Sequence, residues 1–443
     1  MRVIATCLFT LLAAACGNVS SFTDAGSTDS NSYDSAPTID ANPRGLVKVT
    51  VLDPTGTGAP VTGVPVVFVE PDGTVAARVA TDGQGKAQAE VLPGSSVTAV
   101  YTVSTNEHAM HTITGAQIGD DIVITPQLNS SPAGTFTVNF PPLSGATYYY
   151  VSTPCGLSYA GLPANNQYVV TFYQFCKPAT TMTVSVVGFT ASGFGGYLEK
   201  ANVAVSAGAT TLTGSWQTGV NYSANFTNIP TEAAYLSHNR ATPDVAGYSF
   251  GNSAQVTGPM MNLQFTAATG ASAVATTRLQ NTQYAQQQTI YQTIAGSALS
   301  YNLDVGANLL PWIGQPTLDV TTGVIKVATS GAGTGDLFRV SAGYSRTTGN
   351  TTEYYRWVVY SATATDITLP KLPAEVGDVN PKTGDVVQDY NWEATLGDSD
   401  VITGYDQVRE HACQIYAASL TPYGNINLGM STLVRVSYFQ NAS

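Results

Sequence analysis

Charged residues are scarce in this chain, since 17 lysines and arginines and 29 aspartates and glutamates make up only 10% of 443 residues. An ordinary soluble protein has about 25%. So few basic residues argue against nucleic-acid binding, which needs a basic surface. Hydrophobic residues, at 43%, are too frequent for a disordered chain. The Leu, Glu, Lys and Arg that build helices are sparse, whereas Thr, Val, Tyr, Ser and Gly indicate strands and turns.

Histidine and cysteine are also rare, with four and five residues respectively. A hydrolytic nucleophile needs a base beside it, and His411 and Cys413 would share a face on a strand. Their surroundings match no protease signature, so we favour a small buried apolar role for Cys413. The pair His108 and His111 supplies two ligands where zinc needs three or four. We therefore expect polar surface histidines there and no catalytic residues elsewhere.

Residues 1–15 carry one positive charge and then an apolar run too short to span a bilayer, which is typical of a secretory signal. The ending Ala13-Ala14-Ala15-Cys16 resembles a bacterial lipobox. That resemblance implies that Cys16 is lipidated and becomes the first mature residue, and Gly17 implies sorting to the outer membrane. The alternative is an ordinary signal peptide with a free Cys16. No later segment has the ~18 apolar residues of a transmembrane helix.

Residues 16–44 consist mainly of Ser, Thr, Asp, Asn, Gly and Pro. Such a segment cannot bury enough apolar surface to offset the entropy of ordering it. We expect a flexible tether between a lipidated Cys16 and a folded body.

Residues 45–128 alternate apolar and polar positions in short runs separated by Asp-Gly and Pro-Gly turns, which predicts an antiparallel β-sandwich. The runs 63–68, 81–87 and 92–94 resemble bacterial Ig-like repeats of the invasin type and are similar to the carboxypeptidase-regulatory-like sandwich. The resemblance implies an Ig-like fold and a spacer, stalk or accessory role, and it brings no catalytic motif.

The same pattern continues to the end of the chain. It predicts a second sandwich at 134–228 and a β-rich domain at 229–443, in which we expect 278–292 to form strands. The fold class is therefore all-β, with tandem sandwiches behind a lipidated tether. Cys155 and Cys176 end neighbouring strand-like runs, so we favour a disulfide between them over other pairings.

Two groups of side chains are candidates for ligand binding. Asp378 and Asn380 match the first and third positions of a calcium loop, and Asp398 and Asp400 add oxygen donors, but Lys382 falls where a ligand should be. Calcium is the only cofactor that we consider. Among the aromatic residues of 354–360, Tyr354 and Trp357 are candidates for stacking on sugar rings. Positions in the core or on a sheet face are the preferred interpretation for these aromatic residues.

These patterns together resemble bacterial surface lipoproteins built from β-sandwiches. We expect a non-catalytic lipoprotein of the cell envelope, at the outer membrane, with a structural or adhesive role. Its partners would be the membrane, through the anchor, and glycans or other envelope proteins. The first alternative is a carbohydrate-binding lipoprotein, and the weakest is a hydrolase of polysaccharides or peptides.

Overall fold

The computed structural model describes residues 43–53, 59–124, 132–153, 156–161, 166–173, 180–241, 254–255, 260–265, 272–281, 286–388, 392–400, 402, 404–410 and 432–440. Within these ranges no helix has the length and apolar character needed to cross a bilayer. Strands make up most of the described chain, so the predicted all-β fold class is confirmed.

Three groups of strands follow one another along the chain. The first sandwich contains β1 (Gly45–Val51), β2 (Pro65–Val69), β3 (Val75–Ala80), β4 (Lys86–Val91), β5 (Ser95–Ser104), β6 (Glu107–Ala116) and β7 (Asp121–Ile124). The second sandwich contains β8 (Pro132–Asn139), β9 (Ala146–Thr153), β10 (Gly156–Gly161), β11 (Gln167–Tyr173), β12 (Thr181–Thr190), β13 (Gly193–Ala204) and β14 (Ala209–Thr211). The third sandwich contains β15 (Val220–Thr227), β16 (Ala233–Ala241), β17 (Ala254–Gln255), β18 (Met260–Phe265), β19 (Ser272–Asn281), β20 (Gln286–Ala295) and β21 (Ser300–Asp304).

The three sandwiches have the same strand order. In each, one sheet holds the fourth, first and seventh strands, and the other runs third, second, fifth, sixth. The first strand pairs in parallel with the seventh every time. Seven strands in a three-stranded and a four-stranded sheet are also the numbers of a constant-type Ig domain. The chain thus repeats one supersecondary plan three times. Strand β15 belongs to the third sandwich, because it pairs with β18 and β21.

Alternation and turn chemistry explain why these residues form strands. In β1 the side chains of Val47, Val49 and Val51 are buried and Lys48 is exposed, as expected for a sheet with one face on the core. The turn before β4 is held by Asp82, whose Oδ1 accepts the amide hydrogens of Gln84 and Lys86 at 2.8 and 2.9 Å. Gly85 has a φ of 70°, and a Cβ there would lie 2.6 Å from a backbone oxygen, so only glycine fits.

The remaining elements form a fourth unit with a different plan. Its strands are β22 (Trp312–Ile313), β23 (Thr317–Asp319), β24 (Val324–Lys326), β25 (Thr329–Ser330), β26 (Leu337–Thr348), β27 (Thr351–Ser361), β28 (Ile367–Thr368), β29 (Val386–Val387), β30 (Glu393–Ser399) and β31 (Leu433–Gln440). The short helices described are η1 (Val205–Ala207), η2 (Gly306–Asn308), η3 (Ala374–Val376) and α2 (Tyr405–Glu410).

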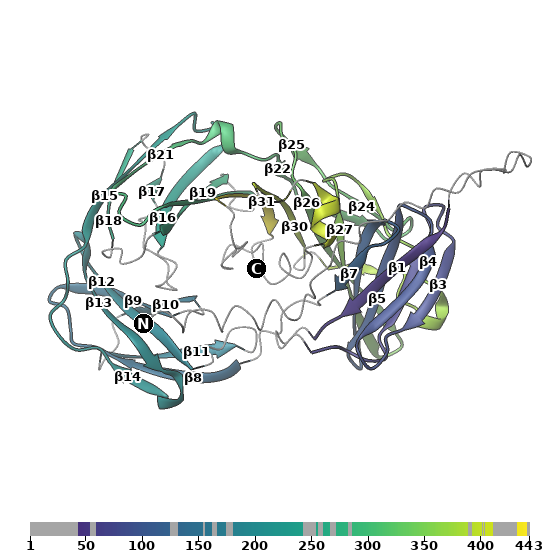
Figure 1. Ribbon diagram of the computed structural model, residues 1–443, viewed down its shortest axis with the longest axis horizontal. Coiled ribbons are helices and arrows are strands. Elements are labelled where there is room, and N and C mark those ends of the chain that lie inside the picture. Colours follow the sequence, from purple (N-terminus) through teal and green to yellow (C-terminus); the bar gives the residue numbers. More distant parts are fainter. Residues whose placement is uncertain are drawn as a thin grey trace, which may run out of the picture.

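The fourth unit joins the third sandwich to the first within one 13-stranded sheet. Its strand β31 pairs antiparallel with β20, the sixth strand of the third sandwich. On the other side, β27 pairs in parallel with β6, the sixth strand of the first sandwich. In Figure 1 the units follow one another around an arc, and the fourth unit lies against the first. We call the pairing of β6 with β27 the seam.

Two hydrophobic cores cross the seam. The core of the first sandwich is completed by Leu337, Val358, Tyr360, Ile402, Tyr405 and Val408 of the fourth unit. On the opposite face of the sheet, Val67, Val69, Val100 and Met110 of the first sandwich pack into the core of the fourth. The two units therefore share apolar interior as well as backbone hydrogen bonds.

The structure tests some of the segment predictions and leaves others outside the described residues. The strands expected at 278–292 are confirmed as parts of β19 and β20. The signal peptide, the tether, Cys16, the proposed disulfide of Cys155 and Cys176, and the pair His411 and Cys413 lie outside the described residues. They stay predictions, as do the domain boundaries at 45–128, 134–228 and 229–443.

Candidate functional site

The seam is the place where distant parts of the chain bring polar side chains together. Seven residue pairs align Glu107–Ile113 with Tyr354–Tyr360. At its centre Trp357, fully buried, lies opposite Met110 and donates its indole N–H to Thr112 Oγ1 at 2.8 Å. Thr112 in turn shares a 2.8 Å hydrogen bond with Thr98 on β5. A chain of hydrogen bonds thus runs from β27 through β6 to β5.

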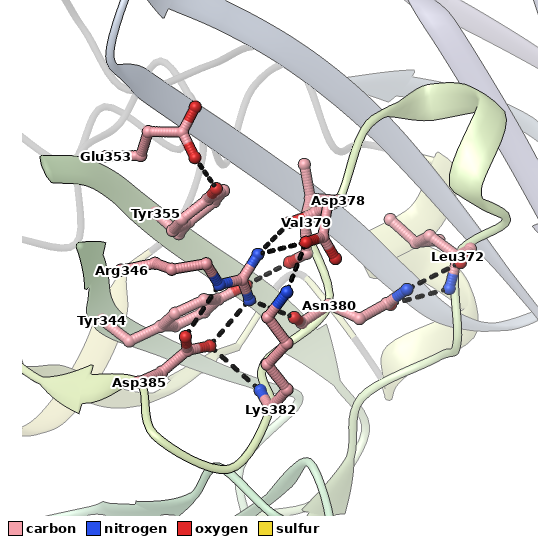
Figure 2. A network of polar contacts seen from close by, with 10 residues as sticks. All are labelled: Tyr344, Arg346, Glu353, Tyr355, Leu372, Asp378, Val379, Asn380, Lys382 and Asp385. Carbon is pink, nitrogen blue, oxygen red and sulfur yellow. Dashed lines mark hydrogen bonds and ion pairs between the residues drawn. The ribbon is translucent and has the colours of Figure 1, made fainter. Parts of the chain in front are cut away.

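On one face of the fourth unit's sheet, a loop after η3 is fastened to β26 by Arg346 (Figure 2). The guanidinium forms two 2.8 Å bonds to the carboxylate of Asp385 and one 2.8 Å bond to the Asn380 carbonyl. It also lies 3.0 Å from Asp378 Oδ2. Hydrogen bonding to Asp385 raises the pKa of Arg346 above its usual value. At this site the guanidinium of Arg346 is the cation, and oxygen atoms of Asp385, Asn380 and Asp378 surround it.

Aromatic rings form a row beneath this network and extend it across the seam. His108 on β6 stacks on Tyr355 on β27 with centroids 5.3 Å apart, and Tyr355 stacks on Tyr344 on β26 at 5.0 Å. The Arg346 guanidinium lies 5.0 Å from the centre of the Tyr355 ring, within the range of a cation–π contact. Figure 2 shows the hydroxyl of Tyr355 directed at Glu353, a bond of 2.6 Å.

The calcium candidates do not converge. The Asp378 carboxylate contacts Arg346 and Lys382, and the Asn380 side chain bonds the backbone of Leu372 at 2.7 and 2.9 Å. Asp398 is paired with Arg435, and Asp400 accepts the Thr432 amide hydrogen at 2.9 Å. In the described part of the chain no three or more His, Cys, Asp or Glu side chains are placed to hold a metal. Calcium binding stays an untested prediction, with these oxygens already engaged.

The opposite face of the seam carries a second charged group. Arg339 and Arg356 both approach Oε2 of Glu393, at 3.0 and 3.3 Å. Arg356 also donates to Ser341 Oγ at 2.9 Å. Next to them is His111, only 3% exposed, which contradicts the expectation of a surface histidine. The pairing in the strand accounts for this, because β5 and β27 flank His111 on both sides.

Burial lowers the pKa of His111 to about 3, with a further contribution from the charges of Arg356 and Arg339. A second buried histidine, His238, lies in the core of the third sandwich, where its Nδ1 is 3.0 Å from Thr277 Oγ1. Burial lowers its pKa to about 3 as well. Both side chains are neutral in the folded protein at neutral pH.

These two histidines predict that mild acid destabilises the protein. Unfolded histidine binds a proton near pH 6.5, whereas the folded state does so only near pH 3. Stability is therefore complete above about pH 6.5 and is lost as the pH falls toward 3, by about 2 kcal/mol for each histidine at pH 5. Denaturant midpoints measured from pH 7.5 to pH 5 should decrease accordingly. His111→Phe should remove about half of this slope, because His238 contributes the other half. A midpoint independent of pH would contradict the neutral buried state.

Of the two sugar-stacking candidates, only one is accessible. Tyr354 is 45% exposed at the start of the seam, whereas Trp357 is fully buried. Trp357 is therefore not available to stack on a ligand, and its core position, the preferred interpretation, is confirmed, because alternation along β27 directs it into the core. Sequence reasoning did not identify Arg339, Arg346, Arg356 or Glu393 as site residues.

Comparison with known proteins adds little to this site. No protein-family model matches the chain, and no curated protein matches it. Solved structures of bacterial surface proteins show a low similarity to this chain. The major pilin subunit BcpA of Bacillus cereus is 8% identical with a TM-score of 0.16, over 59% of this chain and 99% of that one. Two B repeat units of the Staphylococcus aureus collagen binding protein are 10% identical with a TM-score of 0.14, over 76% and 97%.

A Ca²⁺-stabilised, ice-binding adhesin of an Antarctic bacterium is 10% identical with a TM-score of 0.12, over 80% of this chain and 95% of that one. TM-scores this low mean that the structures do not superpose as whole chains. The similarity therefore carries no conclusion about what this protein binds or does.

Proposed function

We propose that this chain is a non-catalytic lipoprotein of the bacterial cell envelope, with a structural or adhesive role. The observation that carries the proposal is the seam, through which the last unit of the chain pairs with the first. Tandem sandwiches joined only by linkers can bend at every junction. Here the first and fourth units share a sheet and two cores, so their mutual orientation is fixed.

The charged side chains of the described residues support the same role. Arg346 fastens a loop to a strand, and Glu393 holds arginines of two neighbouring strands. These contacts connect secondary-structure elements to one another. They are the contacts expected of a rigid body that presents its surface to a partner.

The lipid on Cys16 would attach this body to the outer membrane, since several acyl chains anchor a protein stably where one does not. A flexible tether over residues 17–44 would have a root-mean-square end-to-end distance of about 30 Å. The folded body would then lie close to the membrane without being embedded in it. The proposed disulfide between Cys155 and Cys176 would further stiffen the second sandwich.

The anchor is tested by Cys16→Ser in the native host. The variant keeps the signal sequence, so it should still be exported. It should lose incorporation of labelled palmitate and move from the membrane fraction to the soluble envelope fraction. Cys413→Ser serves as the matched control and should remain membrane-bound and labelled. A Cys16→Ser protein that stays wholly in the membrane fraction would refute the anchor.

Carbohydrate binding is the second candidate function. It is favoured by one observation, the exposed ring of Tyr354 on the face of the seam that also carries Arg339 and Arg356. Aromatic faces stack on the apolar faces of sugar rings, and guanidinium groups bind carboxylates.

A further inference from the structure

The polar face of the seam gathers side chains from five adjacent strands. Strand pairing places Glu393, Ser341, Val358 and His111 in one row across β30, β26, β27 and β6. Residues directly opposite in a ladder, and residues two apart on a strand, point to the same face. The same face therefore carries Arg339, Arg356 and Tyr354, and Tyr101 on β5. We call this set of residues the arginine face.

The arginine face carries charges of both signs, because Glu107 lies opposite Tyr354 on the same face and its charge acts on Arg356. Two guanidinium groups share a single carboxylate, and both bind the same oxygen of it, at 3.0 and 3.3 Å. The side chains of Arg339 and Arg356 are 16% and 25% exposed, so solvent reaches them. A carboxylate of a ligand would use guanidinium N–H donors that Glu393 does not engage.

Two polar atoms beside the arginines have no hydrogen-bond partner among the residues that the structure describes. The Nδ1 of His111 and the hydroxyl of Tyr101 are buried and form no hydrogen bond with any residue that the structure describes. Their rings meet edge to face, with centroids 5.6 Å apart. Buried polar groups in native proteins are nearly always paired, so two orphans side by side indicate a missing ligand or water.

We propose that the arginine face binds a carboxylate-bearing sugar, a uronic-acid residue of an acidic glycan. Arg356 and Arg339 bind the carboxylate, and the hydroxyl of Tyr101 and the ring nitrogen of His111 bind oxygens of the sugar. Tyr354, two residues before Arg356 on β27 and 45% exposed, stacks on the ring. The site is additional to the scaffold role, because the seam pairs whether or not the site is filled.

The test is calorimetric titration of the full-length protein in detergent with trigalacturonate. The neutral counterpart, galactotriose, and sodium acetate are titrated in parallel. We expect trigalacturonate to bind at least tenfold more tightly than either of these. The affinity should fall as salt is raised, because the contact is ionic.

Variants then assign the binding to this face. Arg356→Gln should weaken trigalacturonate binding about tenfold or more, as loss of a charge-assisted hydrogen bond does. Tyr354→Ala, at an exposed position that does not threaten folding, should weaken it about fivefold or more. Arg78→Gln, at an exposed arginine on β3, is the matched control and should bind as the parent does.

Each contrary result overturns the proposal. Equal affinity for galactotriose would show that the carboxylate is not recognised, and equal affinity for acetate would show that the sugar ring is not. No binding of trigalacturonate would show that water alone fills the site. Binding that survives both Arg356→Gln and Tyr354→Ala would place the glycan elsewhere. None of these results would affect the anchor or the seam, which have their own tests.

Discussion

Trp357→Ala is expected to open the seam and to lower the free energy of unfolding by about 3–5 kcal/mol. The indole is fully buried in a core shared by two units, so its removal leaves a cavity that the surrounding strands cannot readily fill. It also leaves the Thr112 hydroxyl without its donor. The measurement is hydrogen exchange of the backbone amides of β6 and β27, together with denaturant unfolding.

The control for this variant is Trp216→Ala. Trp216 is partly buried against the second sandwich and donates to the Pro142 carbonyl at 3.3 Å. Its replacement should destabilise that sandwich and leave exchange in β6 and β27 as slow as before. If Trp357→Ala leaves exchange in both seam strands unchanged, the indole does not hold the seam.

Arg346→Ala is the second variant for which we expect a large effect. It leaves the Asp385 carboxylate, 2% exposed, without its cation, and an uncompensated buried charge costs about 3–5 kcal/mol. The Asn380 carbonyl and the Tyr355 ring also lose their partner. The loop after η3 should detach from β26 and become sensitive to protease, which mass spectrometry of limited digests would detect.

Two further variants sharpen this test. Arg346→Lys keeps the charge but cannot bind the carboxylate through two parallel bonds, so it should restore only part of the stability. Lys382→Gln removes an exposed partner of Asp378, and such surface pairs contribute at most about 1 kcal/mol. If Arg346→Ala were no more destabilising than Lys382→Gln, the network would not fasten the loop.

The sequence predicted the strands well because their signals are local. Alternating valines in 45–51 and the Asp-Gly turn at 82–83 are visible within a few residues. The same rule predicted that alternate aromatics of 354–360 enter the core, as Trp357 does, while Tyr354 lies at the surface. Local patterns, however, do not say which strand lies next to which.

The seam is non-local and left no such signal. Strand β27 pairs with β6 across a separation of 247 residues, from 354 − 107, and in parallel. Nothing in either segment distinguishes an edge that accepts a strand from one that faces water. For the same reason the repeated strand order of the three sandwiches appears only in the pairing, since the repeats differ in loop lengths and residues.

The charged groups had a signal that the sequence reasoning did not use. In a chain with only 10% charged residues, an arginine inside an apolar strand is unusual, as in Leu337–Arg346 and Tyr354–Tyr360. A buried arginine requires a carboxylate nearby. Asp378 was singled out as a calcium ligand because its loop is rich in oxygen, and the structure fills that loop with Arg346 instead. The sequence alone does not show that the cation next to Asp378 is Arg346, because the two residues are brought together only by the fold.

The most direct test of the pairing between the first and fourth units is a cross-link in the register of the seam. Glu107 and Tyr354 are direct partners at its open end, so Glu107→Cys combined with Tyr354→Cys brings two thiols within disulfide reach. Mild oxidation should join them within one chain, as peptide mapping would show. The displaced pair Glu107→Cys and Thr351→Cys should remain reduced. Free thiols in the first pair, or links only between chains, would contradict the pairing of the first and fourth units.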